Sequence, residues 1–127
     1  MKPKNQYLHI LLFLMFFNFS FSQEVKQNFE INISISKNQI VFDSNGGCNF
    51  IKLSASHKEF AMNQNGMINL KADRDEIESS KFIFTVERRG GKINLKGIKN
   101  TKWEELNLEL NSNSVATITE NGLKSKN

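Results

Sequence analysis

The chain has 127 residues, with 17 lysines and arginines, 13 aspartates and glutamates, and a formal net charge of +4. Two of the lysines, Lys2 and Lys4, lie at the N-terminus, so the rest is close to neutral and lacks the basic tail typical of nucleic-acid-binding proteins. A single cysteine excludes an internal disulfide, and the length allows one small core, so packing must supply the stability.

The first segment has the three parts of an export signal. A positive start, an apolar run and a small-x-small cleavage pattern are formed by Lys2 and Lys4, by Tyr7–Phe19 and by Ser20–Ser22. We therefore predict a signal peptide over residues 1–22 and a mature protein that begins at Gln23. The mature protein is expected in the periplasm, on the cell surface or outside the cell.

A membrane anchor is the alternative for the same segment. Crossing a bilayer takes about 20 apolar residues, whereas this run is shorter and contains His9 and Asn18. No cysteine follows the apolar run at the position where a lipid anchor would be attached, since Cys48 lies far beyond it. We expect cleavage, and no stable membrane span afterwards.

From Phe29 onward, apolar residues alternate with polar ones. This pattern is typical of a half-buried strand, because successive strand side chains point to opposite faces. The apolar positions of the first strand are Phe29, Ile31, Ile33 and Ile35. The alternation recurs in Ile40–Phe42, Phe50–Ala55, Met67–Leu70, Phe82–Val86, Ile93–Leu95, Leu106–Leu110 and Val115–Thr119. Short strands with turn residues between most of them predict an all-β sandwich or barrel.

The clearest local unit is a hairpin that turns at Gly90-Gly91. Its strands are predicted over Phe82–Glu87 and Lys92–Lys96. The inward-facing residues are expected to be Phe82, Phe84, Val86, Ile93 and Leu95. The alternation breaks at Gly97-Ile98, which predicts a bulge or a bend.

Two other stretches have less regular patterns. Thr101–Glu104 has the form of a helix capping box, so a helix over residues 102–110 is one alternative. The alternation of leucines in Leu106–Leu110 favours a strand there, preceded by at most one helical turn. Residues 73–80 are interpreted as a polar connection, and residues 124–127 as a frayed end.

One run of residues has the pattern of a known family. The run is Ile35–Gly47, and its matching positions are Ile35, Ser36, Ile40, Phe42, Gly46 and Gly47. It resembles the opening of a BACON domain (Bacteroidetes-associated carbohydrate-binding often N-terminal). Asn65–Leu70 resembles the central strand of that family, and Ser80–Val86 with Gly90-Gly91 resembles its closing hairpin. Lys37 stands where the family has a proline.

The resemblance covers about residues 33–99. It implies an antiparallel immunoglobulin-like β-sandwich on a secreted or surface protein, with a role in carbohydrate binding. We accordingly predict one domain over residues 23–127, with a BACON-like core over 28–99 and a C-terminal hairpin with a frayed tail over 100–127.

Few residues of the mature chain have the chemistry of a catalytic or metal site. Its one histidine, His57, has Ser56 and Glu59 too near in sequence to indicate a catalytic triad. One histidine and Cys48 cannot make a zinc site, and the acidic run Asp73–Glu78 lacks the spacing of a calcium loop. We expect no enzyme activity, no metal and no cofactor. Cys48 is either a small buried residue or an exposed thiol that bridges two molecules.

The densest basic cluster of the chain begins at the predicted hairpin and consists of Arg88, Arg89, Lys92, Lys96, Lys99 and Lys102. Lys92, Asn94 and Lys96 share its outward phase, so several cations can meet an anionic glycan or a phosphate. The alternative is a solvated face whose charges prevent edge pairing. Trp103 is either a core residue or a contact residue. The predicted ligand-binding residues are Arg88, Arg89, Lys92, Asn94, Lys96 and Trp103.

The sequence therefore predicts a secreted, non-catalytic β-sandwich module for binding or adhesion at the cell envelope. Its expected ligand is a glycan or an anionic polysaccharide. The alternative is a structural or accessory envelope protein that acts through protein–protein contacts, for example at an exposed strand edge. No nucleic-acid partner is expected.

Overall fold

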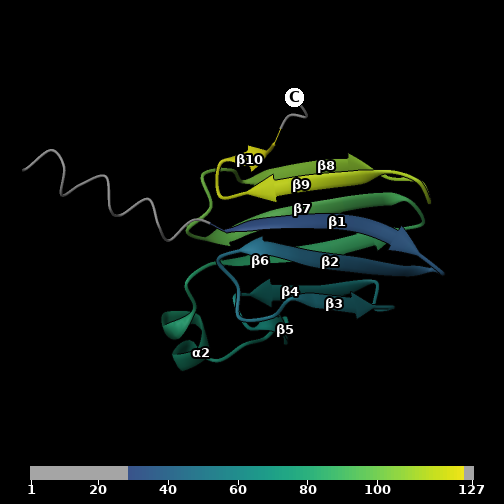
Figure 1. Cartoon of the computed structure of the whole chain (residues 1–127). Helices are drawn as coiled ribbons and strands as arrows, with labels where there is room; N and C mark the ends of the chain where they lie inside the picture. Colours follow the sequence, from purple (N-terminus) through teal and green to yellow (C-terminus); the bar gives the residue numbers. More distant parts are fainter. Residues whose placement is uncertain (1–28, 125–127) are drawn as a thin grey trace, which may run out of the picture.

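The computed structural model describes residues 29–124, which form two antiparallel sheets packed face to face (Figure 1). Sheet A has five strands in the order β10-β9-β1-β2-β3, and sheet B has five in the order β5-β4-β6-β7-β8. The strands are β1 Glu30–Ser36, β2 Gln39–Gly46, β3 Lys52–Ala55, β4 Glu59–Asn63, β5 Gly66–Ile68, β6 Ile83–Arg89, β7 Lys92–Lys99, β8 Glu105–Glu109, β9 Val115–Thr119 and β10 Gly122–Leu123. The predicted all-β sandwich is confirmed.

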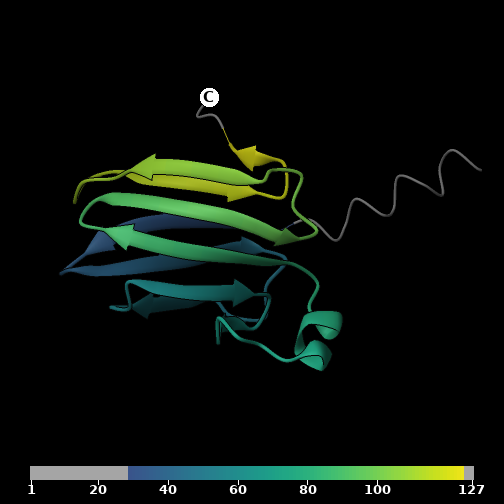
Figure 2. The same cartoon turned by 180° about the vertical axis from the view of Figure 1, so that it is seen from behind.

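The chain passes between the two sheets twice, after β3 and after β8 (Figures 1 and 2). β1, β2 and β3 follow one another in sheet A, and β6, β7 and β8 follow one another in sheet B. β9 then returns to pair with β1, so that Ile31 lies opposite Ile118. Both ends of the described chain are thereby held in sheet A.

The core lies between the sheets and is built by the alternation seen in the sequence. β1 contributes Ile31 and Ile33, both 0% exposed, and β6 contributes Phe84, also 0% exposed. The rings of Phe29 and Phe82 stack with their centroids 4.1 Å apart. All five inward residues predicted for the hairpin are buried. Burial of these large apolar side chains is the main stabilising contribution, worth about 1.5–3 kcal/mol for each one.

The hairpin of β6 and β7 contains the expected irregularity. Ile83 pairs with Lys99 and Phe84 pairs with Gly97, so Ile98 is the extra residue of a β-bulge. The predicted bulge at Gly97-Ile98 is therefore confirmed.

In one central strand the alternation of the sequence is obscured. β4 lies between β5 and β6, and four of its five residues, from Phe60 to Asn63, are buried. Phe60 and Met62 belong to the core, while Ala61, between them in the strand, is buried on the other face. Glu59 and Asn63 share the face of Ala61, so the strand has a polar side, but the buried Ala61 between them hides the period-two pattern in so short a run.

The expected polar connection over residues 73–80 is in part a short helix, α2, over Arg74–Ser79. The Asp73 carboxylate caps it by accepting a hydrogen bond of 2.8 Å from the backbone N–H of Glu76. At the other end, Lys99 Nζ donates to the carbonyl oxygen of Ile77 at 2.8 Å. None of the helix residues is buried, so no apolar period marks the helix in the sequence.

The C-terminal hairpin expected over residues 100–127 is wrong. β8 pairs with β7 in sheet B, whereas β9 pairs with β1 and β10 in sheet A. The two strands lie in different sheets because they bury their apolar side chains from opposite sides of the core. Leu108 of β8 is buried from sheet B, and Ile118 of β9 is buried from sheet A. The strand alternative for Leu106–Leu110 is confirmed, and Thr101–Glu104 forms no helical turn.

The predicted signal peptide over residues 1–22 lies outside the described residues. Between residues 29 and 124, no helix has the length and apolar character needed to cross a membrane.

Candidate binding face on sheet B

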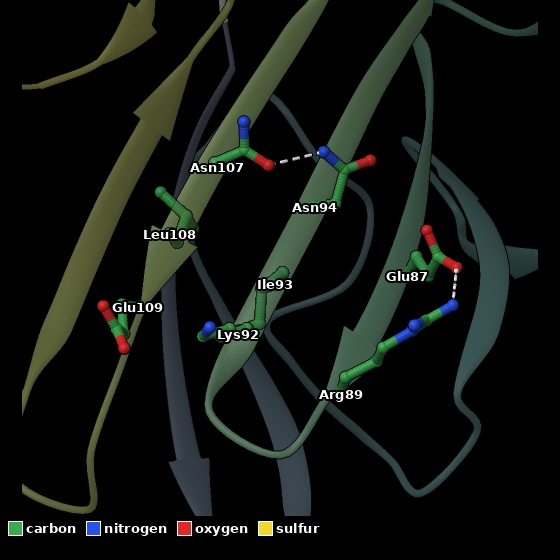
Figure 3. A pocket seen from close by; sticks show the side chains of 8 residues that line it. All are labelled: Glu87, Arg89, Lys92, Ile93, Asn94, Asn107, Leu108 and Glu109. Atoms are coloured by element: carbon green, nitrogen blue, oxygen red, sulfur yellow. Dashed lines mark hydrogen bonds and ion pairs between the residues drawn. The ribbon is translucent and has the colours of Figure 1, made fainter.

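The outward-facing side chains of β6, β7 and β8 form one continuous surface, which we call the B face. Its charged and amide side chains are those of Glu87, Arg89, Lys92, Asn94, Lys96, Glu105, Asn107 and Glu109, and Thr85 lies beside Lys96 on the same face. They share a face because antiparallel partners project to the same side of a sheet. The close view in Figure 3 shows six of them around an open depression of about 410 Å³.

Two asparagines on adjacent strands lie at the centre of the B face. Asn94 Nδ2 donates to Asn107 Oδ1 and to Glu105 Oε2, both at 2.6 Å. Within residues 29–124, no hydrogen bond reaches the Asn94 Oδ1 acceptor or the Asn107 Nδ2 donors. Figure 3 shows both atoms turned away from the shared bond. The shared bond fixes the orientation of both amides, so the pair presents one oriented acceptor, Asn94 Oδ1, and one oriented donor group, Asn107 Nδ2, to a ligand.

Charges of both signs surround the asparagine pair. Lys92 lies opposite Glu109, and Lys96 lies opposite Glu105, in the register of β7 and β8. On β6, Arg89 Nη2 lies 3.5 Å from a Glu87 carboxylate oxygen. The three cations are thus matched by three carboxylates. Such exposed pairs contribute little stability, about 0–1 kcal/mol each, and they leave the B face without a net positive field.

Arg88 does not lie on the B face. It has the inward phase of β6, one residue beyond Glu87, and its guanidinium reaches sheet A at the end of the sandwich. Nη2 donates to the carbonyl oxygen of Asn38 at 3.0 Å and to that of Ser56 at 3.4 Å. The prediction of Arg88 as a ligand contact is not supported, because these bonds give its side chain a structural role.

Trp103 does not lie on the B face either. It is only 8% exposed, its ring centroid is 6.0 Å from that of Phe84, and its indole Nε1 donates to the carbonyl oxygen of Thr119 at 2.9 Å. A ring buried in this way has no open face for a sugar. The core alternative for Trp103 holds, and the contact alternative does not.

The four remaining predicted residues, Arg89, Lys92, Asn94 and Lys96, are brought together on the B face as their phase in the hairpin predicts. Four further residues of the B face were not predicted from the sequence: Glu87, Glu105, Asn107 and Glu109. Glu87 has the same outward phase as Arg89 and was recognisable from the hairpin. The three residues of β8 were not, because their neighbours on β7 depend on a register set by the irregular segment 100–104.

Among the described residues, no cluster of three or more histidine, cysteine, aspartate or glutamate side chains is arranged to hold a metal ion. Cys48 is half-buried and packs against the core. Burial raises the pKa of its thiol, and a hydrogen bond involving Ser44 opposes that shift. Its placement resembles the buried alternative more closely than the exposed one.

In comparisons with known proteins, no family model, no curated protein and no solved structure matches this chain. The resemblance to a BACON domain therefore stays an interpretation of the sequence.

Proposed function

We propose that this protein is a secreted, non-catalytic binding module of the cell envelope and that the B face holds a neutral, hydroxyl-rich ligand such as a glycan. The observation that carries the proposal is the Asn94–Asn107 pair in a depression with matched charges. Its volume falls in the range of about 300–1,000 Å³ that is usual for small-molecule sites.

The chemistry of the B face fits sugar hydroxyls, each of which can donate one hydrogen bond and accept others. Asn94 Oδ1 can accept a hydrogen bond and Asn107 Nδ2 can donate one. The carboxylate of Glu109 adds a further acceptor, and the ammonium of Lys92 adds a further donor. Because cations and carboxylates are equal in number, the B face favours a neutral glycan over the anionic polysaccharide that the basic cluster suggested.

The aromatic side chains indicate how strong such binding is. None of the described phenylalanines is exposed, and Trp103 is buried. A ligand on the B face is therefore held by hydrogen bonds and not by stacking on a ring. We expect weak affinity, in the millimolar range, since hydrogen bonds exchanged with water contribute about 1 kcal/mol each.

We further propose that the sandwich is immunoglobulin-like in architecture only. Two antiparallel sheets with inward alternation support the architecture. The strand order differs from that of immunoglobulin domains, which pass between their sheets more often than the two passages seen here, between β3 and β4 and between β8 and β9. Export to the envelope rests on the signal predicted over residues 1–22.

The proposal is tested with the mature protein and a panel of soluble oligosaccharides. Saturation-transfer NMR with maltohexaose, cellohexaose, laminarihexaose and an anionic oligogalacturonate should give a signal with at least one neutral sugar. The double substitution Asn94→Ala with Asn107→Ala should weaken that binding about tenfold, because two directional contacts are lost.

A matched control lies on the opposite side of the molecule. Asn45 and Asn32 on sheet A are also joined through their side-chain amides, with Asn45 Nδ2 3.2 Å from Asn32 Oδ1. Replacing both with alanine should leave sugar binding unchanged. Equal loss in the two double variants, or a signal with the anionic sugar alone, contradicts the proposal.

A further inference from the structure

The outer edge of β8 is a second surface with its own chemistry. At one end of the strand the backbone N–H of Leu110 donates to Gly91 at 2.8 Å, and at the other the N–H of Gly97 donates to Glu104 at 3.0 Å. In an antiparallel ladder, hydrogen-bonded pairs alternate with pairs whose groups point outward. The residues of β8 whose backbone groups point away from β7 are Glu105, Asn107 and Glu109.

This edge is exposed and terminal. β8 is the last strand of sheet B among the described residues, and its three outward-pointing residues are exposed. With five residues, β8 is longer than the other terminal strands, which have four (β3), three (β5) and two (β10). Unpaired donors and acceptors along a strand of this length form a template for a further strand.

The opposite sheet extends beyond β8. Figures 1 and 2 both show β8 and β9 at the same end of the sandwich, with β10 beyond them. Leu123 of β10 pairs with Ile118, and both therefore project to the core side of sheet A. Ile118 is 0% exposed whereas Leu123 is 50% exposed. An added strand next to β8 would face Leu123 and cover it.

The charges of β8 determine which kind of strand can pair with its outer edge. If a second copy paired through the same edge about Asn107, Glu105 would lie opposite Glu109 of that copy, and like charges in that position are destabilising. The edge therefore disfavours self-association. It favours a strand with cations four residues apart, which would lie opposite the two glutamates.

We propose that the outer edge of β8 binds an extended segment of another protein by antiparallel strand addition. The segment has Lys or Arg at two positions four residues apart, opposite Glu109 and Glu105, and apolar residues between them that pack beside Leu106 and Leu108. β8 already has such a partner on its inner side, since Lys92–Lys96 has this pattern and pairs with it in the same register. Main-chain hydrogen bonds give such a complex its affinity, and side chains on alternate positions give it specificity.

The test uses two peptides with the sequence of residues 91–97, GKINLKG, that differ only in backbone methylation. In the first, N-methyl groups replace the amide hydrogens of Ile and Leu, which would point away from β8 in the proposed pairing. In the second, they replace those of both lysines and Asn, which would point toward it. Binding to the mature protein is measured by fluorescence anisotropy of labelled peptides.

The first peptide should bind, and the second should bind at least about tenfold more weakly, because net hydrogen bonds of about 1 kcal/mol each are removed. Glu105→Gln with Glu109→Gln should also weaken the first peptide, with an unchanged circular dichroism spectrum. Equal binding of the two peptides would mean charge attraction without strand addition, and it overturns the proposal. So does the absence of binding at millimolar peptide.

Discussion

Arg88 connects the two sheets through the carbonyl oxygen of Asn38, which lies 50 residues earlier in the chain. The guanidinium Nη2 donates to this oxygen at 3.0 Å, from the end of β6 in sheet B to the β1–β2 turn in sheet A. Asn38 and its neighbour Lys37 have positive φ values of 66° and 51°, as a tight two-residue hairpin turn requires. The arginine therefore stabilises the β1–β2 turn, whose backbone conformation is unfavourable for most residues other than glycine and asparagine.

Replacing Arg88 with alanine should lower the free energy of unfolding by about 2 kcal/mol, since two hydrogen bonds from a charged donor are lost. Arg89→Ala is the matched control, because the side chain of Arg89 is 83% exposed and makes only one exposed ion pair. It should change stability by less than about 0.5 kcal/mol. Urea denaturation measures both, and equal effects would contradict the structural role of Arg88.

Gly97→Ala should destabilise the protein by about 1–3 kcal/mol, the usual cost of forcing atoms into a packed site. A Cβ atom at Gly97 would overlap the backbone oxygen of Trp103 and the hydroxyl of Thr101. Gly46→Ala is the control, since nothing lies within 4 Å of a Cβ there. Thermal unfolding followed by circular dichroism should show a large decrease in Tm for the first variant alone.

The stability contributed by Glu30 should depend on pH. A hydrogen bond from Lys124 and a second from Asn45 lower the pKa of the Glu30 carboxyl. Because its pKa is lower in the folded than in the unfolded chain, its contribution is full above about pH 5 and is lost as the pH falls through the lowered value. Glu30→Gln should therefore cost less than about 1 kcal/mol at pH 7, an amount reduced by salt. A difference of the same size at pH 2 would contradict this account.

Cys48 should react slowly in the native protein. Burial raises the pKa of its thiol, so at pH 8 less of it is in the reactive thiolate form. Labelling with a disulfide reagent should be at least about tenfold slower in buffer than in denaturing urea. Equal rates would indicate an accessible thiol and would restore the alternative of an intermolecular bridge.

Local alternation was sufficient to predict the position of most strands, although not where each one ends. The buried isoleucines of β1 and the inward residues of the β6–β7 hairpin could be predicted from the sequence, because each of these strands has one solvent-exposed face and one buried face. β4 could not, since the buried Ala61 on its outward face interrupts the alternation of polar and apolar residues. The short helix α2 could not either, since no face of it is buried.

The candidate site was predictable only in part. The phase of the hairpin separates Lys92 and Asn94 from the core, and the same phase, applied to β6, places Arg88 inward and Arg89 outward. The alternation within one strand does not show which residue lies opposite on the neighbouring strand. Asn107 meets Asn94 because the bulged end of β7 and the segment before β8 set the register between them.

The most direct measurement is an amide chemical-shift map of the ¹⁵N-labelled protein, produced from Gln23 onward, titrated with the neutral oligosaccharide of the panel that binds. We predict that the largest shifts occur in the side-chain amides of Asn94 and Asn107 and in the backbone of β7 and β8. Shifts centred on Asn32 and Asn45, on the outer side of sheet A, would contradict it.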